Sequence, residues 1–173
     1  QRQTHGKLPV NIGVGMNTDN VVSGNIGSKK RMDFTIIGDG VNLASRLESA
    51  CKQYGTHILV SESTYKRLRG TYQARELDLV VVKGKTQPVA IYEILDYHTD
   101  ETYPNLIDAL GHFHNALTKY RQRKWQDATR LLNEVLALNP NDKPAQLYIE
   151  RCRYFIDNPP GDDWDGVWVM ESK

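Results

Sequence analysis

The spacing of apolar residues changes near residue 100, and this change constrains the fold more than any other feature of the sequence. Before it, apolar residues mostly alternate with polar ones in short runs separated by glycine and polar turns, as in half-buried β-strands. After it, apolar residues recur at the period of an α-helix with one buried face. The sequence therefore predicts an α+β domain over residues 1–96 and an all-α module over residues 97–173.

The first part is expected to alternate short strands with two helices. A first strand carries Val10, Ile12, Val14 and Met16 on one face, and its small residues Gly13 and Gly15 leave space on the other. Further strands are expected at residues 32–37, 58–60, 77–82 and 89–95, with a turn-rich connection at 24–30. Helices are expected at residues 41–53, where Asp39 serves as the cap, and 61–68. The order is ββ(αβ)αββ.

The second part is expected to contain three helices. Apolar residues at helical spacing define the first two helices, and the second one stops at Asn139-Pro140. Pro144 is well placed to begin a third helix that runs to about Phe155. Trp125 and Ala128 are three residues apart and should share a buried face with Tyr120. The aromatic stretch 164–170 is expected to pack back on the helices.

Charge and cysteine content exclude several classes of protein. The chain has 22 basic and 21 acidic residues, a net charge of +1, so electrostatics do not favour a nucleic-acid binder. Cys51 and Cys152 lie far apart without a C-x-x-C motif, which argues against a disulfide framework or a structural zinc site. No apolar run approaches the roughly 20 residues that span a bilayer. We therefore expect a soluble, cytoplasmic protein without a membrane span.

Asn42 and Arg46 are the residues whose spacing suggests chemistry. They lie four apart on the expected helix, so an amide and a guanidinium project from one face in its first turns. Leu43 and Leu47 occupy the adjoining buried face. This pair near a helix N-terminus suits a phosphate and a ribose oxygen. The alternative is an ordinary solvated helix face, in which the arginine pairs with a neighbour such as Glu48.

The run Gly-x-x-Val-Asn-x-Ala-x-Arg-Leu at residues 38–47 carries a resemblance to a known family. Together with Gly24-Asn25-Ile26-Gly27 and Val82-Lys83-Gly84-Lys85, it resembles the C-terminal half of a class III nucleotidyl cyclase catalytic domain. The resemblance covers about residues 8–96 and implies a ferredoxin-like sheet with helices. The helical module resembles one tetratricopeptide-like repeat followed by a half-repeat.

The resemblance implies roles for individual residues. Asn42 would orient the ribose, and Arg46 would stabilise charge on the α-phosphorus. Thr35, seven residues before Asn42, would contact the base and favours ATP, although without the resemblance an ordinary β-branched strand residue is the more frequent case. Lys83 would contact the β- and γ-phosphates, with Lys85 as the alternative, and both could instead be solvated charges at a strand edge. Gly24 and Gly27 would permit a tight turn near the dimer partner, or serve the backbone alone.

The function implied is that of an adenylyl cyclase, which converts ATP to cyclic AMP and pyrophosphate at sites shared within a homodimer. The two Mg²⁺ ions, for which Mn²⁺ could substitute, would be bound by aspartates upstream of Gln1, as would the adenine by a lysine. No metal ligand is expected within these 173 residues. Upstream sensor domains are also implied. The alternatives are a guanylyl cyclase of the same fold and an inactive cyclase-like module that binds a nucleotide or scaffolds partners.

Overall fold

The computed structural model describes residues 12–28, 31–81 and 88–167. A four-stranded sheet forms the centre, in the order β1-β4-β6-β5. Its strands are β1 (Val14–Met16), β4 (Ile58–Ser61), β6 (Val89–Ile94) and β5 (Ala74–Val80). β1 and β4 are parallel, and the other neighbours are antiparallel. The chain is thus a mixed α+β fold, as the sequence predicts.

Helix α1 (Asp39–Tyr54) lies against the sheet, and its buried face is made of residues three and four apart. These residues are Leu43, Leu47, Cys51 and Tyr54. A Cβ atom on Gly15 of β1 would overlap the backbone of Ala44 and Glu48, so only glycine allows this close contact. The space that Gly15 leaves beside the first strand is therefore filled by α1. The helix ends at Gly55, whose φ of 67° is in the left-handed region.

The start of α1 differs from the expectation that Asp39 caps it. Gly38 occupies the capping position, and Asp39 is the first helical residue; the capping position provides no side-chain hydrogen bond to the first N–H groups of the helix. The φ of Gly38 is 155°, a conformation that favours glycine. The capping position of the helix therefore lies one residue earlier than predicted. Asp39 instead places a carboxylate in the first turn, where it interacts favourably with the helix dipole.

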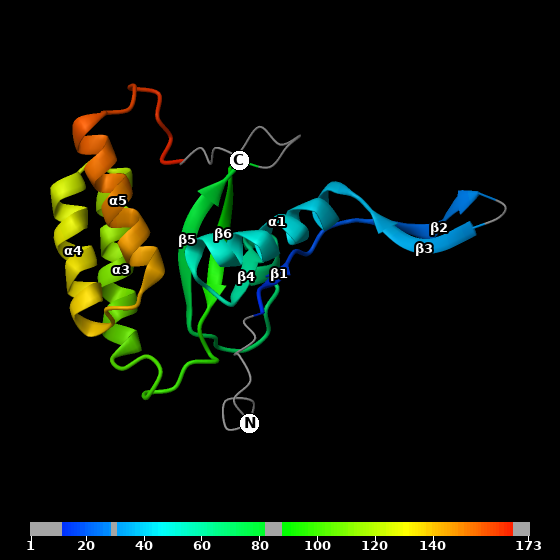
Figure 1. The fold of residues 1–173 in the computed structure, drawn as a ribbon, viewed down its shortest axis with the longest axis horizontal. Helices are drawn as coiled ribbons and strands as arrows, with labels where there is room; N and C mark the ends of the chain where they lie inside the picture. The colour runs from blue at the N-terminus through cyan, green and yellow to red at the C-terminus, as the bar shows by residue number, and fades with distance from the viewer. Residues whose placement is uncertain (1–11, 29–30, 82–87, 168–173) are drawn as a thin grey trace, which may run out of the picture.

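Strands β2 (Val22–Ser28) and β3 (Arg31–Ile37) form an antiparallel hairpin that projects away from the rest of the molecule (Figure 1). The expectation of a turn-rich connection at residues 24–30 is wrong for residues 24–28, which belong to β2, and its last two residues lie outside the described chain. Gly24 pairs with Thr35 and Gly27 with Met32, so neither glycine makes a tight turn. Pairing with β3 overrides the low strand propensity of these glycines.

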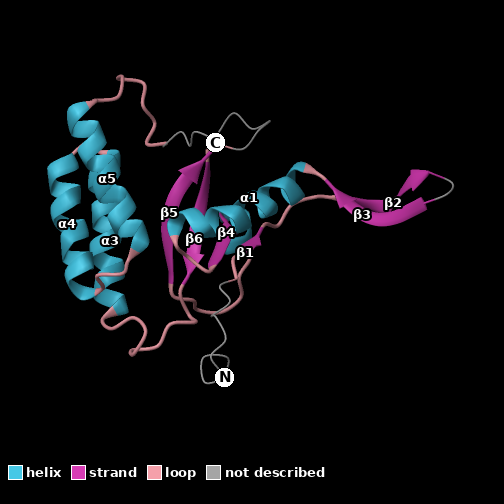
Figure 2. Cartoon of the chain, viewed as in Figure 1, coloured by secondary structure: helices cyan, strands magenta, loops and turns pink. Residues whose placement is uncertain are grey.

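Three helices, α3 (Leu106–Arg121), α4 (Trp125–Leu138) and α5 (Lys143–Asp157), lie side by side next to β5 (Figure 2). The expected contact of Trp125 with Tyr120 is confirmed, with ring centroids 5.3 Å apart, and Ala128 is buried beside them. Trp164 packs back on the same cluster, 5.3 Å from Trp125. A short helix, α2 (Glu62–Tyr65), follows β4. In the described part of the chain, no helix is long and apolar enough to cross a bilayer.

One hydrophobic core runs through the sheet and the three helices. Leu77 and Ile91 of the sheet belong to the same buried cluster as Phe113 and Ile149 of the helices. The packing is therefore continuous across residue 96, where the pattern of the sequence changes.

Charged residues are buried where the sheet meets the helices. Arg75 of β5 donates to Glu93 of β6 and to Asp142, both at 2.7 Å. Asp142 also caps α5 by accepting from the backbone N–H of Ala145 at 2.9 Å. Burial by itself lowers the pKa of Arg75, but the carboxylates of Glu93 and Asp142 outweigh it and raise that pKa. The guanidinium is thus held charged inside the protein.

Candidate functional site

Asn42 and Arg46 lie on the exposed face of α1, in the half of the helix nearer the hairpin. Leu43 and Leu47 hold the opposite face in the core, at 3% and 1% exposure. The helix therefore presents an amide and an always-charged guanidinium to solvent from a backbone that is anchored behind them. This is the arrangement that the spacing predicts.

Thr35 lies on β3, the strand that leads into α1 through Gly38. It is half-buried and pairs with Gly24 on β2. A Cβ atom on Gly24 would meet nothing within 4 Å, so the space beside this residue is open. Thr35 on β3 and the pair Asn42 and Arg46 on α1 thus belong to two consecutive elements, which Gly38 joins. Lys83 and Lys85 lie outside the described residues, between β5 and β6.

The first turns of α1 are held by Asn17, a residue that the sequence analysis missed. Its side-chain N–H₂ donates to the carbonyl of Gly40 at 3.0 Å, while its carbonyl oxygen accepts from Ser61 at 2.6 Å and Ser63 at 3.1 Å. A Cβ on Gly40 would lie 2.5 Å from the Cβ of Asp19. Asn17 thereby joins the end of β1, the start of α1 and the end of β4. The polar run that follows the first strand is the only sequence signal of this role.

Groups buried in the core of the sheet and the helices have strongly shifted pKa values. Burial and then the neighbouring carboxylate of Asp78 raise the pKa of Tyr54. Burial also raises the pKa of Cys152 to about 11. These groups are structural, because partners inside the core surround them. The face of α1 that carries Asn42 and Arg46 is suited to electrostatic positioning of an anion rather than to proton transfer.

A metal site is not formed by the part of the chain that the structure describes. There, no three side chains of histidine, cysteine, aspartate or glutamate are grouped so that they could hold an ion. The divalent ions that the resemblance implies therefore do not fit these residues.

Apolar side chains are exposed around the same region. Val22 is 73% and Phe34 71% exposed on the hairpin, and Met32, Ile36 and Ile37 are also exposed. Such a concentration of exposed apolar residues is typical of a surface that another chain or segment covers. The candidate site thus borders an apolar surface that is exposed in the described part of the chain.

Comparisons with known proteins identify relatives of this chain. The family model for the adenylate and guanylate cyclase catalytic domain matches residues 1–103. The terminal-differentiation-specific adenylate cyclase of Dictyostelium discoideum is 36% identical over 147 residues, 83% of this chain and 7% of that protein. An adenylate cyclase of Anabaena cylindrica is 42% identical over 88 residues, 49% of this chain and 18% of that protein. A crystal structure of the adenylyl cyclase CyaB from P. aeruginosa is 40% identical and covers 57% of this chain and 50% of that one, with a TM-score of 0.46.

The chain spans less than a fifth of the length of these two curated relatives. The Dictyostelium match covers 83% of this chain, so it continues beyond residue 103 into the helices. The family model itself matches more than half of the 173 residues. The chain therefore belongs to the adenylate and guanylate cyclase catalytic domain family.

Proposed function

We propose that this chain supplies the ribose- and phosphate-positioning part of an adenylate cyclase site. In the reaction, the ribose 3′-oxygen of ATP forms a bond to the α-phosphorus while the bond from that phosphorus to the oxygen bridging the α- and β-phosphates breaks. The 3′-hydroxyl gives its proton to solvent, and pyrophosphate leaves. The observation that carries the proposal is the exposed pair Asn42 and Arg46 on a helix whose other face is fixed in the core.

Each residue of the pair has a defined task. The amide of Asn42 hydrogen-bonds the ribose and holds its hydroxyl in line with the α-phosphorus. The guanidinium of Arg46 stabilises the charge that gathers on the phosphoryl oxygens in the transition state. Lys83, or else Lys85, neutralises the β- and γ-phosphates. The protein's contribution is therefore positioning and charge stabilisation.

ATP is the proposed substrate because of Thr35. A threonine hydroxyl can accept a hydrogen bond from the amino group of adenine or donate one to a ring nitrogen. The two curated relatives described above are named adenylate cyclases. GTP is the alternative substrate, since the matching family model includes guanylate cyclases.

The site is proposed to be completed by a second chain in a homodimer. The exposed apolar residues of the hairpin support this, because they lie on β2 and β3, the strands that precede α1. Two Mg²⁺ ions, which Mn²⁺ could replace, activate the 3′-hydroxyl and neutralise phosphates in such a reaction. We propose that residues outside this chain bind them. The helices α3–α5, which are tetratricopeptide-like in pattern, are proposed to contribute no reacting group.

The test compares the turnover of ATP and GTP by the protein that carries this chain, with and without Arg46→Ala. The variant should lower kcat for ATP by about 100-fold or more and leave KM within a few-fold, because the charge acts mainly in the transition state. Arg153→Ala is the control, since Arg153 is also an exposed helical arginine but lies on α5. A clear preference for GTP would overturn the choice of base, and unchanged kcat in Arg46→Ala would overturn the site.

A further inference from the structure

The last residue of α1 is tied to the helical module through one buried carboxylate. The hydroxyl of Tyr54 donates to Oδ2 of Asp78 on β5, and Nη1 of Arg151 on α5 donates to the same oxygen at 2.6 Å. Nη2 of Arg151 lies 3.5 Å from the Tyr54 hydroxyl. Tyr54 is fully buried, and Asp78 and Arg151 are each 2% exposed. Three elements therefore meet at a single oxygen atom.

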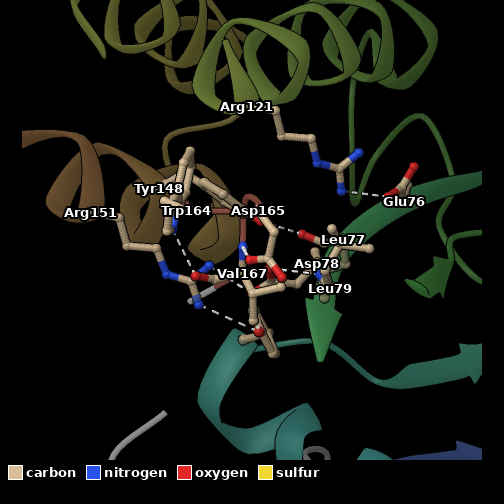
Figure 3. A network of polar contacts seen from close by, with 11 residues as sticks. Glu76, Leu77, Asp78, Leu79, Arg121, Tyr148, Arg151, Trp164, Asp165 and Val167 are labelled. Carbon is tan, nitrogen blue, oxygen red and sulfur yellow. Dashed lines mark hydrogen bonds and ion pairs between the residues drawn. The ribbon is translucent and has the colours of Figure 1, made fainter. Parts of the chain in front are cut away.

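The backbone of β5 is shaped to present this carboxylate. The register with β6 shifts between Glu76 and Asp78, so β5 has a bulge at Leu77. The carbonyl of Leu77 accepts from the hydroxyl of Tyr148 on α5 at 2.9 Å, and the Oδ1 atom of Asp78 accepts from the N–H of Leu79 at 2.8 Å (Figure 3). The bulge thus gives α5 two separate attachments to the sheet, and only the one through Asp78 reaches α1.

Movement of the end of α1 would disrupt these contacts. The charges of Arg151 and Asp78 are out of water, so each depends on its partners inside the protein. The Arg151 guanidinium also lies 4.8 Å from the centre of the Tyr148 ring. A shift of Tyr54 would remove a hydrogen-bond donor from a buried carboxylate. The network therefore resists displacement of the helix end.

The other end of α1 is held by Asn17 through the carbonyl of Gly40. The helix is accordingly fixed at both ends, and Arg46 lies between them. Tyr54 is eight residues beyond Arg46, or about 12 Å along the helix axis. A rigid helix transmits a displacement of its end to the side chains along it, and a misplacement of about 1 Å can cost about 100-fold in rate.

We propose that Tyr54, Asp78 and Arg151 form a positioning network through which the helical module sets the place of Asn42 and Arg46. The inference rests on the proposed function of that pair. It assigns α5 a part in the reaction that needs no contact with the nucleotide. Tyr54 is then a positioning residue, and α5 is a route by which events in the helical module can alter turnover.

The test uses two variants of the full-length protein, in each of which phenylalanine replaces one tyrosine and removes its buried hydroxyl. Tyr54→Phe removes the link from α1 to Asp78 but keeps the Asp78–Arg151 pair. Tyr148→Phe removes the link from α5 to Leu77 and leaves α1 untouched, so it is the matched control. Three quantities are measured for each: kcat and KM for ATP, the unfolding temperature, and deuterium exchange of the amides in residues 39–54.

We expect Tyr54→Phe to lower kcat about 5- to 10-fold, with KM within 2-fold, and to speed exchange in residues 39–54, since a misplaced Arg46 acts mainly on the transition state. Tyr148→Phe should keep kcat within 2-fold and leave that exchange unchanged.

If both variants lower the unfolding temperature equally and keep wild-type kcat and exchange, the network serves stability alone and the inference is overturned. If the wild type cyclises neither ATP nor GTP, the proposed function fails, while the exchange data still decide whether α5 holds α1.

Discussion

The hairpin exposes apolar side chains, whereas the interface between the sheet and the helices buries charged ones. On the hairpin, apolar residues such as Val22 and Phe34 face solvent. At the interface, the charged residues Arg75 and Arg151 are buried with their partners. A buried charge requires that its partners be supplied, and here this chain supplies them itself. An exposed apolar surface requires a cover, and the described chain leaves that surface open.

The difference shows which side of the molecule is packed by residues of this chain and which side has apolar residues exposed. The helices complete the core of the sheet from within the chain, whereas Asn42 and Arg46 lie exposed in the half of α1 that follows the hairpin. A site on the open side suits a reaction centre that a second chain completes. Substitutions of single residues on each side test this contrast.

The largest effect is expected from Asp78→Ala at the interface. The substitution leaves the guanidinium of Arg151 buried without its carboxylate, which should lower the free energy of unfolding by about 3–5 kcal/mol. Urea denaturation followed by tryptophan fluorescence measures this loss. Asp108→Ala is the control, because Asp108 is an exposed carboxylate on α3. Equal stability of the two variants would show that the buried pair contributes nothing to folding.

A loss of comparable or slightly smaller size is expected from Trp125→Ala. This side chain packs against the rings of Tyr120, Phe155 and Trp164 at centroid distances of 5.3, 5.0 and 5.3 Å. Emptying that position should cost about 3–5 kcal/mol, with the smaller figure where the neighbours collapse into the space. Protection of the amides of α3–α5 from deuterium exchange reports the loss directly. Unchanged protection would mean that the aromatic cluster does not hold the three helices together.

On the hairpin, Phe34→Ser should have little effect on the fold of the chain itself. The ring is 71% exposed, so its removal should change the free energy of unfolding of the monomer by no more than about 0.5 kcal/mol. Association of two chains should weaken by at least 10-fold in analytical ultracentrifugation. A variant that stays dimeric at the wild-type concentration would remove the hairpin from the dimer interface.

The smallest effect is expected for chemical labelling of the two cysteines in the folded protein. Burial raises the pKa of Cys152 to about 11 and also raises that of Cys51. At pH 8 both thiols should therefore remain protonated and inaccessible, and should react with an aromatic disulfide reagent only after denaturation. Peptide mass spectrometry identifies the labelled residue. Rapid labelling of Cys51 in the folded protein would show that the contact between α1 and β1 opens readily.

The helices, and the exposure of Asn42 and Arg46 on one of them, could be predicted from the sequence, because glycine, proline and apolar spacing are local signals. The helix expected at 41–53 spans Asp39–Tyr54, and the one expected from Pro144 spans Lys143–Asp157. The strand at residues 22–28 could not be predicted, since its pairing with β3 overrides its own composition. The burial of Arg75 and Arg151 has no local signal in the sequence, and only the tertiary fold shows it. Asn17 was missed for the same reason, because its partners are 23 and 44 residues away.

The network around Asp78 also has a consequence for the order in which the protein acquires its structure. Tyr54 and Arg151 are 97 residues apart, and Asp78 and Arg151 are 73 apart. During synthesis, the sheet therefore leaves the ribosome well before the arginine that neutralises its carboxylate. Until α5 arrives, Asp78 must stay hydrated, so the end of α1 and the bulge of β5 cannot close into their final core. Contacts of such long sequence separation slow folding and leave apolar surface exposed in the meantime. Helix α5 thus completes the packing of α1, which is made well before it.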